Sequence, residues 1–154
     1  MSTIRNFLID QVSKADYQEM IRVWELSVRA THHFLSETDI IFYRDLILSK
    51  YFDLLNLVCV RDPDHGITGF LGTSADKIEM LFIHPDSRGK GIGRQLIRYA
   101  TEELGIRYVD VNEQNDQAVG FYYATGFELY KRSPLDGMGK PYPVLHLQIN
   151  PHKL

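Results

Sequence analysis

The chain has 154 residues, which is the size of one domain, and we expect residues 1–154 to fold as a single unit. Hydrophobic residues make up 44% of the chain and charged residues 24%, a composition that excludes disordered, collagen-like and coiled-coil proteins. The formal net charge of -3 provides no general attraction for nucleic acid or for an anionic membrane, so neither is expected as a partner.

The amino terminus lacks a long apolar segment after a basic start, and no run of about eighteen apolar residues occurs in the sequence. The single cysteine, Cys59, excludes an internal disulfide and lies in an apolar run, which is typical of a buried, unreactive thiol. The six histidines lack the spacing of a metal site, so no metal is expected. These features predict a cytoplasmic protein.

Apolar periodicity and turn-forming residues predict the elements in chain order. We expect a strand at 4–12, helices at 13–28 and 36–51, strands at 56–61, 66–74 and 77–84, a helix at 91–104, a strand at 107–111, a helix at 115–126, and strands at 127–132 and 143–149. This order predicts one α/β fold with a mixed sheet. Its central strand-helix-strand unit should be parallel, with a right-handed crossover.

The segment Arg88-Gly89-Lys90-Gly91-Ile92-Gly93 follows an apolar strand and opens the helix predicted at 91–104. Glycines let the backbone approach a phosphate closely, and the free N–H groups of a first helical turn point toward an anion. Arg88, Lys90 and Arg94 add positive charge. We therefore predict a pyrophosphate site, against the alternative of a surface turn whose basic side chains are only solvated.

Two other phosphate motifs compete with this interpretation. A P-loop is excluded because no Gly-Lys-Ser/Thr follows the required gap. The dinucleotide fingerprint is a closer rival, since Asp110 lies roughly 20 residues beyond the glycines. However, the glycines are spaced G-x-G-x-G, and the turn lies too far along the chain for a doubly wound sheet. A nicotinamide-dependent reductase is kept as a minor alternative.

Arg88, Gly91 and Gly93 match the hallmark of the GNAT superfamily of acyl-CoA-dependent N-acyltransferases, and the segment from Asn115 to Phe127 resembles its second signature. The resemblance implies a largely antiparallel mixed sheet with a parallel βαβ core and helices on both faces. It also implies acetyl-CoA as co-substrate and a small-molecule or peptide amine as acceptor. The implied cofactor contacts are Leu81, Phe82, Ile83, Arg88, Gly89, Lys90, Gly91, Ile92, Gly93, Arg94, Asn115 and Ala118.

Attack of an amine on a thioester expels a thiolate, and a phenol with a pKa of about 10 can donate a proton to it. The resemblance implies that Tyr122 is this acid, against the alternative of aromatic packing, which we expect for Tyr123. Glu79 is the candidate base, because on its strand it shares a face with Leu81 and Ile83, where an apolar residue is expected. The alternative is that Glu79 reaches solvent or a cation.

The resemblance places the acceptor between the first two helices and the last hairpin, where His32, Phe34 and Tyr142 are candidate substrate residues. Adjacent histidines in a helix connection are also typical of capping or surface positions. Three segments, 30–35, 112–115 and 139–143, resemble a bacterial branch of the superfamily, the YjaB type. We expect direct attack, because Cys59 has no evident activating partner. The sequence leaves two alternatives open: a non-catalytic acyl-CoA-binding or sensing module, and a homodimer rather than a monomer.

Overall fold

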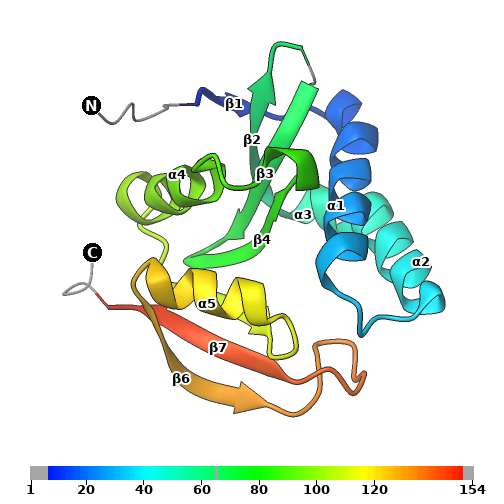
Figure 1. The fold of residues 1–154 in the computed structure, drawn as a ribbon, viewed down its shortest axis with the longest axis vertical. Helices are drawn as coiled ribbons and strands as arrows, with labels where there is room; N and C mark the ends of the chain where they lie inside the picture. The colour runs from blue at the N-terminus through cyan, green and yellow to red at the C-terminus, as the bar shows by residue number, and fades with distance from the viewer. Residues whose placement is uncertain (1–6, 65, 151–154) are drawn as a thin grey trace.

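The computed structural model describes residues 7–64 and 66–150 and contains a seven-stranded sheet with helices on both faces (Figure 1). The strands are β1 (Ile9–Gln11), β2 (Asn56–Asp62), β3 (Gly66–Ser74), β4 (Lys77–Ile83), β5 (Tyr108–Asn112), β6 (Phe127–Ser133) and β7 (Val144–Ile149), in the spatial order β1-β2-β3-β4-β5-β7-β6. The helices are α1 (Tyr17–Thr31), α2 (Glu37–Leu46), α3 (Phe52–Leu54), α4 (Ile92–Arg98) and α5 (Asp116–Ala124). The predicted element order and mixed α/β class are confirmed; residues 4–6 of the first predicted strand lie outside the described residues.

Polar caps fix where the helices begin. The backbone N–H of Ser13 donates to the Asp16 carboxylate at 2.9 Å, which completes a capping box before α1. The side chains of Ser36 and Asn115 each accept from the N–H three residues further on, at 3.1 and 3.2 Å, and cap α2 and α5. The helices α2 and α4 continue into π-helical turns at Ile47–Tyr51 and Tyr99–Glu103. Within the described part of the chain, no helix is long and apolar enough to cross a membrane.

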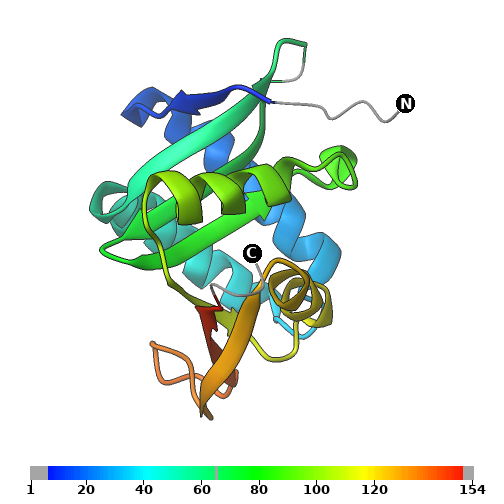
Figure 2. The ribbon, with the colours of Figure 1, turned by 90° about the vertical axis from the view of Figure 1, so that its left-hand side faces the viewer.

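Alternating side chains divide the core into two apolar clusters, one on each face of the sheet. Leu71 and Ile78 belong to the cluster beneath α4 and α5, whereas Phe70 and Met80 belong to the cluster beneath α1 and α2. Figure 2 shows α4 in front of the sheet and α1 behind it. Both layers therefore hold the central strands in place from opposite sides.

The sheet opens between its two central strands, β4 and β5. They form the parallel pair of an otherwise antiparallel sheet, and their pairing is limited to Lys77 with Tyr108 and Ile78 with Val109. Beyond this second pair the strands separate, so in the described residues the end of β4, at 81–83, has no strand partner on that side. The backbone groups along this edge are available to a ligand.

A bulge lies in β4 next to this opening. The register with β3 shifts so that Gly72 pairs with Met80 and Thr73 with Ile78, which leaves Glu79 as the extra residue. A bulge bends the strand and re-aims the side chain of the residue it adds. The bulge therefore interrupts the alternation of side chains between the two faces of the strand. This alternation was the reason for placing Glu79 on the same face as Leu81 and Ile83.

Candidate active site

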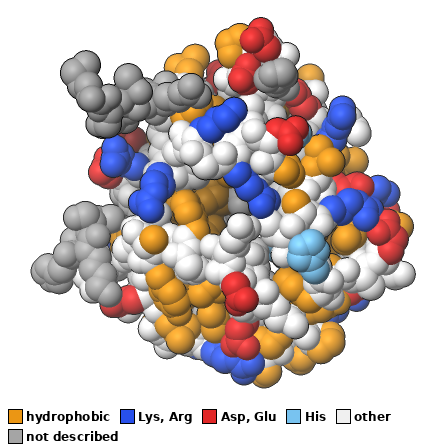
Figure 3. All heavy atoms as spheres, viewed as in Figure 1, with side chains coloured by type: hydrophobic (Ala, Val, Ile, Leu, Met, Phe, Trp, Pro, Cys, Tyr) orange, Lys and Arg blue, Asp and Glu red, His pale blue; other side chains and the backbone are white. Residues whose placement is uncertain are grey.

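A cavity of about 410 Å³ lies between the end of β4, the glycine turn, the start of α5 and the end of α1. Its volume is typical of a pocket for an extended small molecule. The lining residues are Ser27, Thr31, His32, Leu81, Phe82, Ile83, Ser87, Arg88, Gly89, Gly91, Ile92, Gly93, Arg94, Asn115, Gln117, Ala118, Phe121 and Tyr122. Figure 3 shows a hollow with an apolar floor in the middle of this face, with Lys and Arg side chains above it. Both motifs found in the sequence thus meet in one cavity.

The glycine turn needs its glycines for two different reasons. Gly89 and Gly91 have φ angles of 75° and 89°, a region that L-residues with side chains rarely adopt, and open space lies where a Cβ would stand. A Cβ at Gly93 would instead lie 3.2 Å from Cζ of Phe121. The first two glycines therefore shape the turn, and Gly93 allows α4 to approach α5.

The basic residues of the turn are placed differently from one another. The Arg88 guanidinium donates to Oγ of Ser27 at 3.2 Å and to Oε1 of Gln117 at 3.4 Å, so it links α1 to α5 beside the cavity. Burial lowers the pKa of Arg88. Arg94 lines the cavity, whereas Lys90 is exposed and borders a separate hollow. The structure thus brings Arg88 and Arg94, but not Lys90, to the predicted cofactor site.

Tyr122 lines the cavity and is almost fully buried. It is 6% exposed, and its ring packs edge-on against Phe121 and Phe127 with centroids 5.4 and 5.6 Å away. Burial raises the pKa of the Tyr122 phenol above its ordinary value, so the group remains protonated at neutral pH and can donate. Tyr123, expected to pack, is 44% exposed and lies outside the cavity lining.

A chain of hydrogen bonds forms the wall of the cavity between α1 and α5. Oδ1 of Asn115 accepts from the N–H of Ala118, so its Nδ2 donates to Nε2 of His32 at 3.2 Å. Nδ1 of His32 therefore carries the proton and donates to Oγ1 of Thr31 at 2.8 Å, and that hydroxyl donates to the Ser27 carbonyl at 2.9 Å. The network fixes His32 as a neutral imidazole.

The environment of His32 lowers its pKa to about 4, chiefly through burial and secondarily through the positive charge of Arg88. In the unfolded chain a histidine has a pKa of about 6.5. Between about pH 6.5 and about pH 4 this histidine is therefore mostly protonated in the unfolded chain and mostly neutral in the folded protein. The stability contributed by this histidine is therefore present above about pH 6.5 and falls as the pH drops toward about 4.

We expect the free energy of unfolding to fall by about 2 kcal/mol more in the wild type than in His32→Gln between about pH 7 and about pH 5. The reason is that glutamine keeps a polar side chain but cannot take up the proton. Urea unfolding of both proteins at the two pH values measures this difference. Carboxylates that also titrate in this range affect the stability of both proteins equally, so the comparison removes their contribution. Equal pH dependence in the two proteins would contradict the neutral assignment.

Glu79, the candidate base, does not line the cavity. It is exposed at the bulge and accepts a hydrogen bond from Oγ of Ser74 at 2.7 Å. This placement corresponds to the alternative considered from the sequence, in which the carboxylate reaches solvent. The bulge could not be read from the sequence of β4 alone, because it depends on the pairing with β3.

Phe34 and Tyr142 also lie outside the cavity lining but continue from it as a row of rings. The ring centroids are 5.3 Å apart between His32 and Phe34, and 5.9 Å apart between Phe34 and Tyr142. The row leads from the cavity wall toward the loop 134–143. Of the three candidate substrate residues, the structure thus brings only His32 into the cavity itself.

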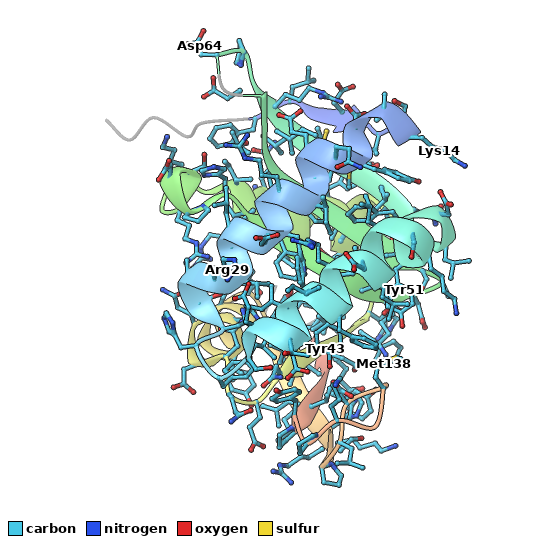
Figure 4. The ribbon with its side chains drawn as sticks, turned by 90° about the vertical axis from the view of Figure 1, so that its right-hand side faces the viewer. Lys14, Arg29, Tyr43, Tyr51, Asp64 and Met138 are labelled. Carbon is cyan, nitrogen blue, oxygen red and sulfur yellow. The ribbon has the colours of Figure 1, made fainter. Side chains whose placement is uncertain are left out.

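The loop between β6 and β7 is tied to α2. Asp39 accepts a hydrogen bond from the Tyr142 hydroxyl and forms an ion pair with Lys140 at 3.0 Å, and both partners lower the pKa of this carboxyl. The Tyr43 hydroxyl donates to Asp136. Figure 4 shows Tyr43 on α2 and Met138 on the loop next to each other. These contacts hold the loop beside the acceptor side that the sequence predicted.

The comparisons with known proteins identify the family of the chain. Residues 55–129 match the family described as an acetyltransferase (GNAT) domain, and the match spans the bulged strand, the glycine turn and α5. The chain belongs to the GNAT family and is an acetyltransferase that moves an acetyl group to an amine. It is 42% identical over 130 residues to the peptidyl-lysine N-acetyltransferase YjaB of Escherichia coli K12, a match that covers 84% of this chain and 88% of that relative. The predicted resemblance to the YjaB type is confirmed.

Solved structures show the same fold. The solution structure of apo-form YjaB from Escherichia coli matches with a TM-score of 0.84 and 36% identity, covering 94% of this chain and 98% of that chain. The crystal structure of the PaiA N-acetyltransferase from Thermoplasma acidophilum, in complex with coenzyme A, matches with a TM-score of 0.70 and 23% identity, covering 92% and 98%. The predicted GNAT-like fold is therefore confirmed.

Some lining residues were not predicted. Ser27 and Ser87 reach the cavity from α1 and from the turn that follows β4, and Gln117 and Phe121 reach it from α5. Phe121 stands three residues after Ala118, a spacing that places both on one side of a helix, so the sequence contained a signal for it. No comparable signal in the sequence connects α1 with the glycine turn.

Proposed function

We propose that the cavity binds acetyl-CoA and that the acceptor is the side-chain amine of a lysine in a peptide or protein. The observation that carries the proposal is that one cavity runs from the glycine turn to Tyr122 alongside the unpaired end of β4. The name of the 42% identical relative, a peptidyl-lysine N-acetyltransferase, supports lysine as the acceptor. The reaction would form a C–N bond and break the C–S bond of the thioester.

The donor would lie in an extended form along this path. Open space beside Gly89 and Gly91 leaves room for a pyrophosphate next to backbone N–H groups, with Arg94 available to pair with its oxygens. The free edge of β4 at 81–83 can pair with the amide groups of the pantetheine arm as a further strand would. The thioester would then lie near Tyr122.

Direct attack by the amine is favoured over an acetylated enzyme. Cys59 is fully buried in β2, and burial raises the pKa of its thiol to about 11, so little thiolate forms at neutral pH. The protonated Tyr122 can donate to the departing sulfur. A buried, unpaired thiol also supports the proposed cytoplasmic setting.

The acceptor proposal is tested with two matched peptides. Each carries one free amine, either a lysine side chain behind a blocked amino terminus or a free amino terminus with no lysine. We expect acetyl-CoA to be consumed and the lysine peptide to gain an acetyl group, which mass spectrometry measures. Transfer to the terminal amine alone would overturn the lysine assignment. Tight coenzyme A binding without transfer to either peptide, or to a wider set of amines, would instead favour a binding or sensing module.

Binding at the turn has its own test. We expect Gly91→Ala to weaken coenzyme A binding at least about tenfold, because the side chain strains a left-handed residue by about 1–2 kcal/mol and shifts the amides of the turn. Titration calorimetry measures the affinity. Gly105→Ala is the control, since Gly105 has a φ of 67° with open space around it but lies outside the cavity lining. Equal loss of affinity in both variants would contradict the proposed pyrophosphate site.

A further inference from the structure

A second polar cluster links four strands through side chains that the cavity does not use. Nδ1 of His146, on β7, lies 2.6 Å from Oδ1 of Asp110 on β5, and Nε2 of the same ring lies 2.7 Å from Oγ of Ser133 on β6. Lys77 of β4 forms an ion pair with the other oxygen of Asp110. Because the carboxylate accepts from Nδ1–H, Nε2 is the basic nitrogen of this imidazole.

The cluster lies on the face of the sheet opposite α4 and α5. Val109 and Leu147 are buried in the core beneath these helices. Successive side chains of a strand point to opposite faces, so Asp110 and His146, which are direct partners in the β5–β7 register, lie on the other face. The cluster therefore lies on the same face of the sheet as α1.

The cluster also lies where the sheet opens. Asp110 follows Val109, which with Ile78 forms the last pair before β4 and β5 separate. The cavity is lined near this opening both by α5 and by the end of α1, which lies on the same face of the sheet as the cluster. The side chains of His146 and Asp110 are 18% and 27% exposed, so an acceptor or a water molecule can reach them.

We infer that His146, oriented by Asp110, accepts the proton that the acceptor ammonium must lose. The inference rests on the proposed function, since a lysine side chain with a pKa of about 10.4 is neutral in roughly one molecule in a thousand at about pH 7.5. The Ser133 hydroxyl, which donates to Nε2 of His146, relays the proton: Oγ takes one proton from the ammonium as its own proton moves to Nε2, and Asp110 stabilises the imidazolium. The free amine then attacks the thioester carbonyl carbon.

The remaining protons and electrons are then accounted for. The C–S electron pair leaves with the sulfur, which takes the Tyr122 proton and departs as the thiol. The second proton of the attacking nitrogen restores the Tyr122 phenol, and His146 releases its proton to solvent. The net reaction converts an ammonium and a thioester into an amide, a thiol and one proton, with no further reactant.

The charged and titratable groups around His146 come from each neighbouring strand. Asp110 and Tyr108 come from β5, and Lys77 from β4 contacts the cluster through Asp110. Lys131 of β6 is a register partner of His146, and the Tyr130 ring lies 6.3 Å from the imidazole between centroids. In direct contact the imidazole meets the Asp110 carboxylate at Nδ1 and the Ser133 hydroxyl at Nε2.

The test separates proton transfer from a structural role by using two peptides of the same length. One contains lysine, and the other has oxygen in place of the ε-methylene, so that its aminooxy group is already neutral at about pH 7.5. We expect His146→Gln to lower kcat/KM about 100-fold for the lysine peptide and less than about threefold for the aminooxy peptide. For lysine, the loss should shrink as the pH rises and free amine becomes abundant.

Gln148→Ala is the matched control, because Gln148 stands two residues further along β7, on the same face and partly exposed. It should leave both rates within about twofold. Equal losses for the two peptides in His146→Gln, or no loss for lysine, would overturn the inference. If this variant fails to fold by circular dichroism, Asp110→Asn must show the same difference between peptides. Failure of the wild type to acetylate either peptide would refute the proposed function instead.

Discussion

Tyr122→Phe is expected to reduce the turnover number for acetyl transfer by about 10²–10³-fold. The variant removes one hydroxyl group that lines the cavity and leaves the ring packed between Phe121 and Phe127. Because burial raises the pKa of Tyr122, the hydroxyl is present as a proton donor throughout the neutral range. Its loss leaves the departing thiolate without that donor. Steady-state kinetics with the lysine peptide measures the effect.

The affinity for coenzyme A should change far less than the turnover number, since the proposed pyrophosphate contacts come from the glycine turn and Arg94 and not from Tyr122. Tyr123→Phe is the control, because Tyr123 lies next along α5, is 44% exposed and does not line the cavity. It should retain nearly full activity. A Tyr122→Phe enzyme with unchanged turnover would remove the phenol from the mechanism, and the Tyr123 control would show whether any loss is specific.

Phe70→Ala is expected to lower the free energy of unfolding by about 3–5 kcal/mol, the usual cost of a large cavity in a closely packed core. Phe70 is fully buried in β3, and its ring lies 5.8 Å from those of Phe52 and Phe82 between centroids. The residues around the ring belong to a helix and two central strands, so the backbone there cannot easily move in to fill the cavity that the ring would leave. Equilibrium unfolding in urea measures the loss.

The comparison variant is Leu54→Ala. Leu54 lies two residues after Phe52 in α3 but is 65% exposed, so it should change stability by less than about 0.5 kcal/mol. Coenzyme A in excess should raise the stability of both variants, because it binds the folded chain and not the unfolded one. Equal stabilities for the two variants would show that the aromatic cluster is not a determinant of the fold.

The order of the elements, the glycine turn and the helical face of α5 could all be predicted from the sequence, because each depends on nearby residues. Asn115 and Tyr122 stand at helical spacing, and the structure places both in the cavity. The start of α5 follows from the cap that Asn115 forms with the N–H three residues on. Local chemistry of this kind does not depend on the rest of the fold.

The parts that could not be predicted depend on strands and helices that meet only after folding. The bulge that exposes Glu79 arises from its register with β3. Arg88 forms a hydrogen bond with Ser27, which lies 61 residues away in the sequence, and His146 forms one with Asp110, which lies 36 residues away. Asp110 stood out in the sequence only for its distance from the glycines, whereas its pairing with His146 follows from the order of β5 and β7.

Because of the opening between β4 and β5, binding of the co-substrate would also raise the stability of the fold and its resistance to proteolysis. Two residue pairs join the halves of the sheet there, so a ligand that pairs with the free edge of β4 would bind the folded chain and not the unfolded one. Such a ligand adds about 2.7 kcal/mol to stability when its concentration reaches about one hundred times its dissociation constant. The fraction of chains open to proteolysis would then fall as the acetyl-CoA supply rises, so the abundance of the enzyme would follow the metabolic state that provides its donor.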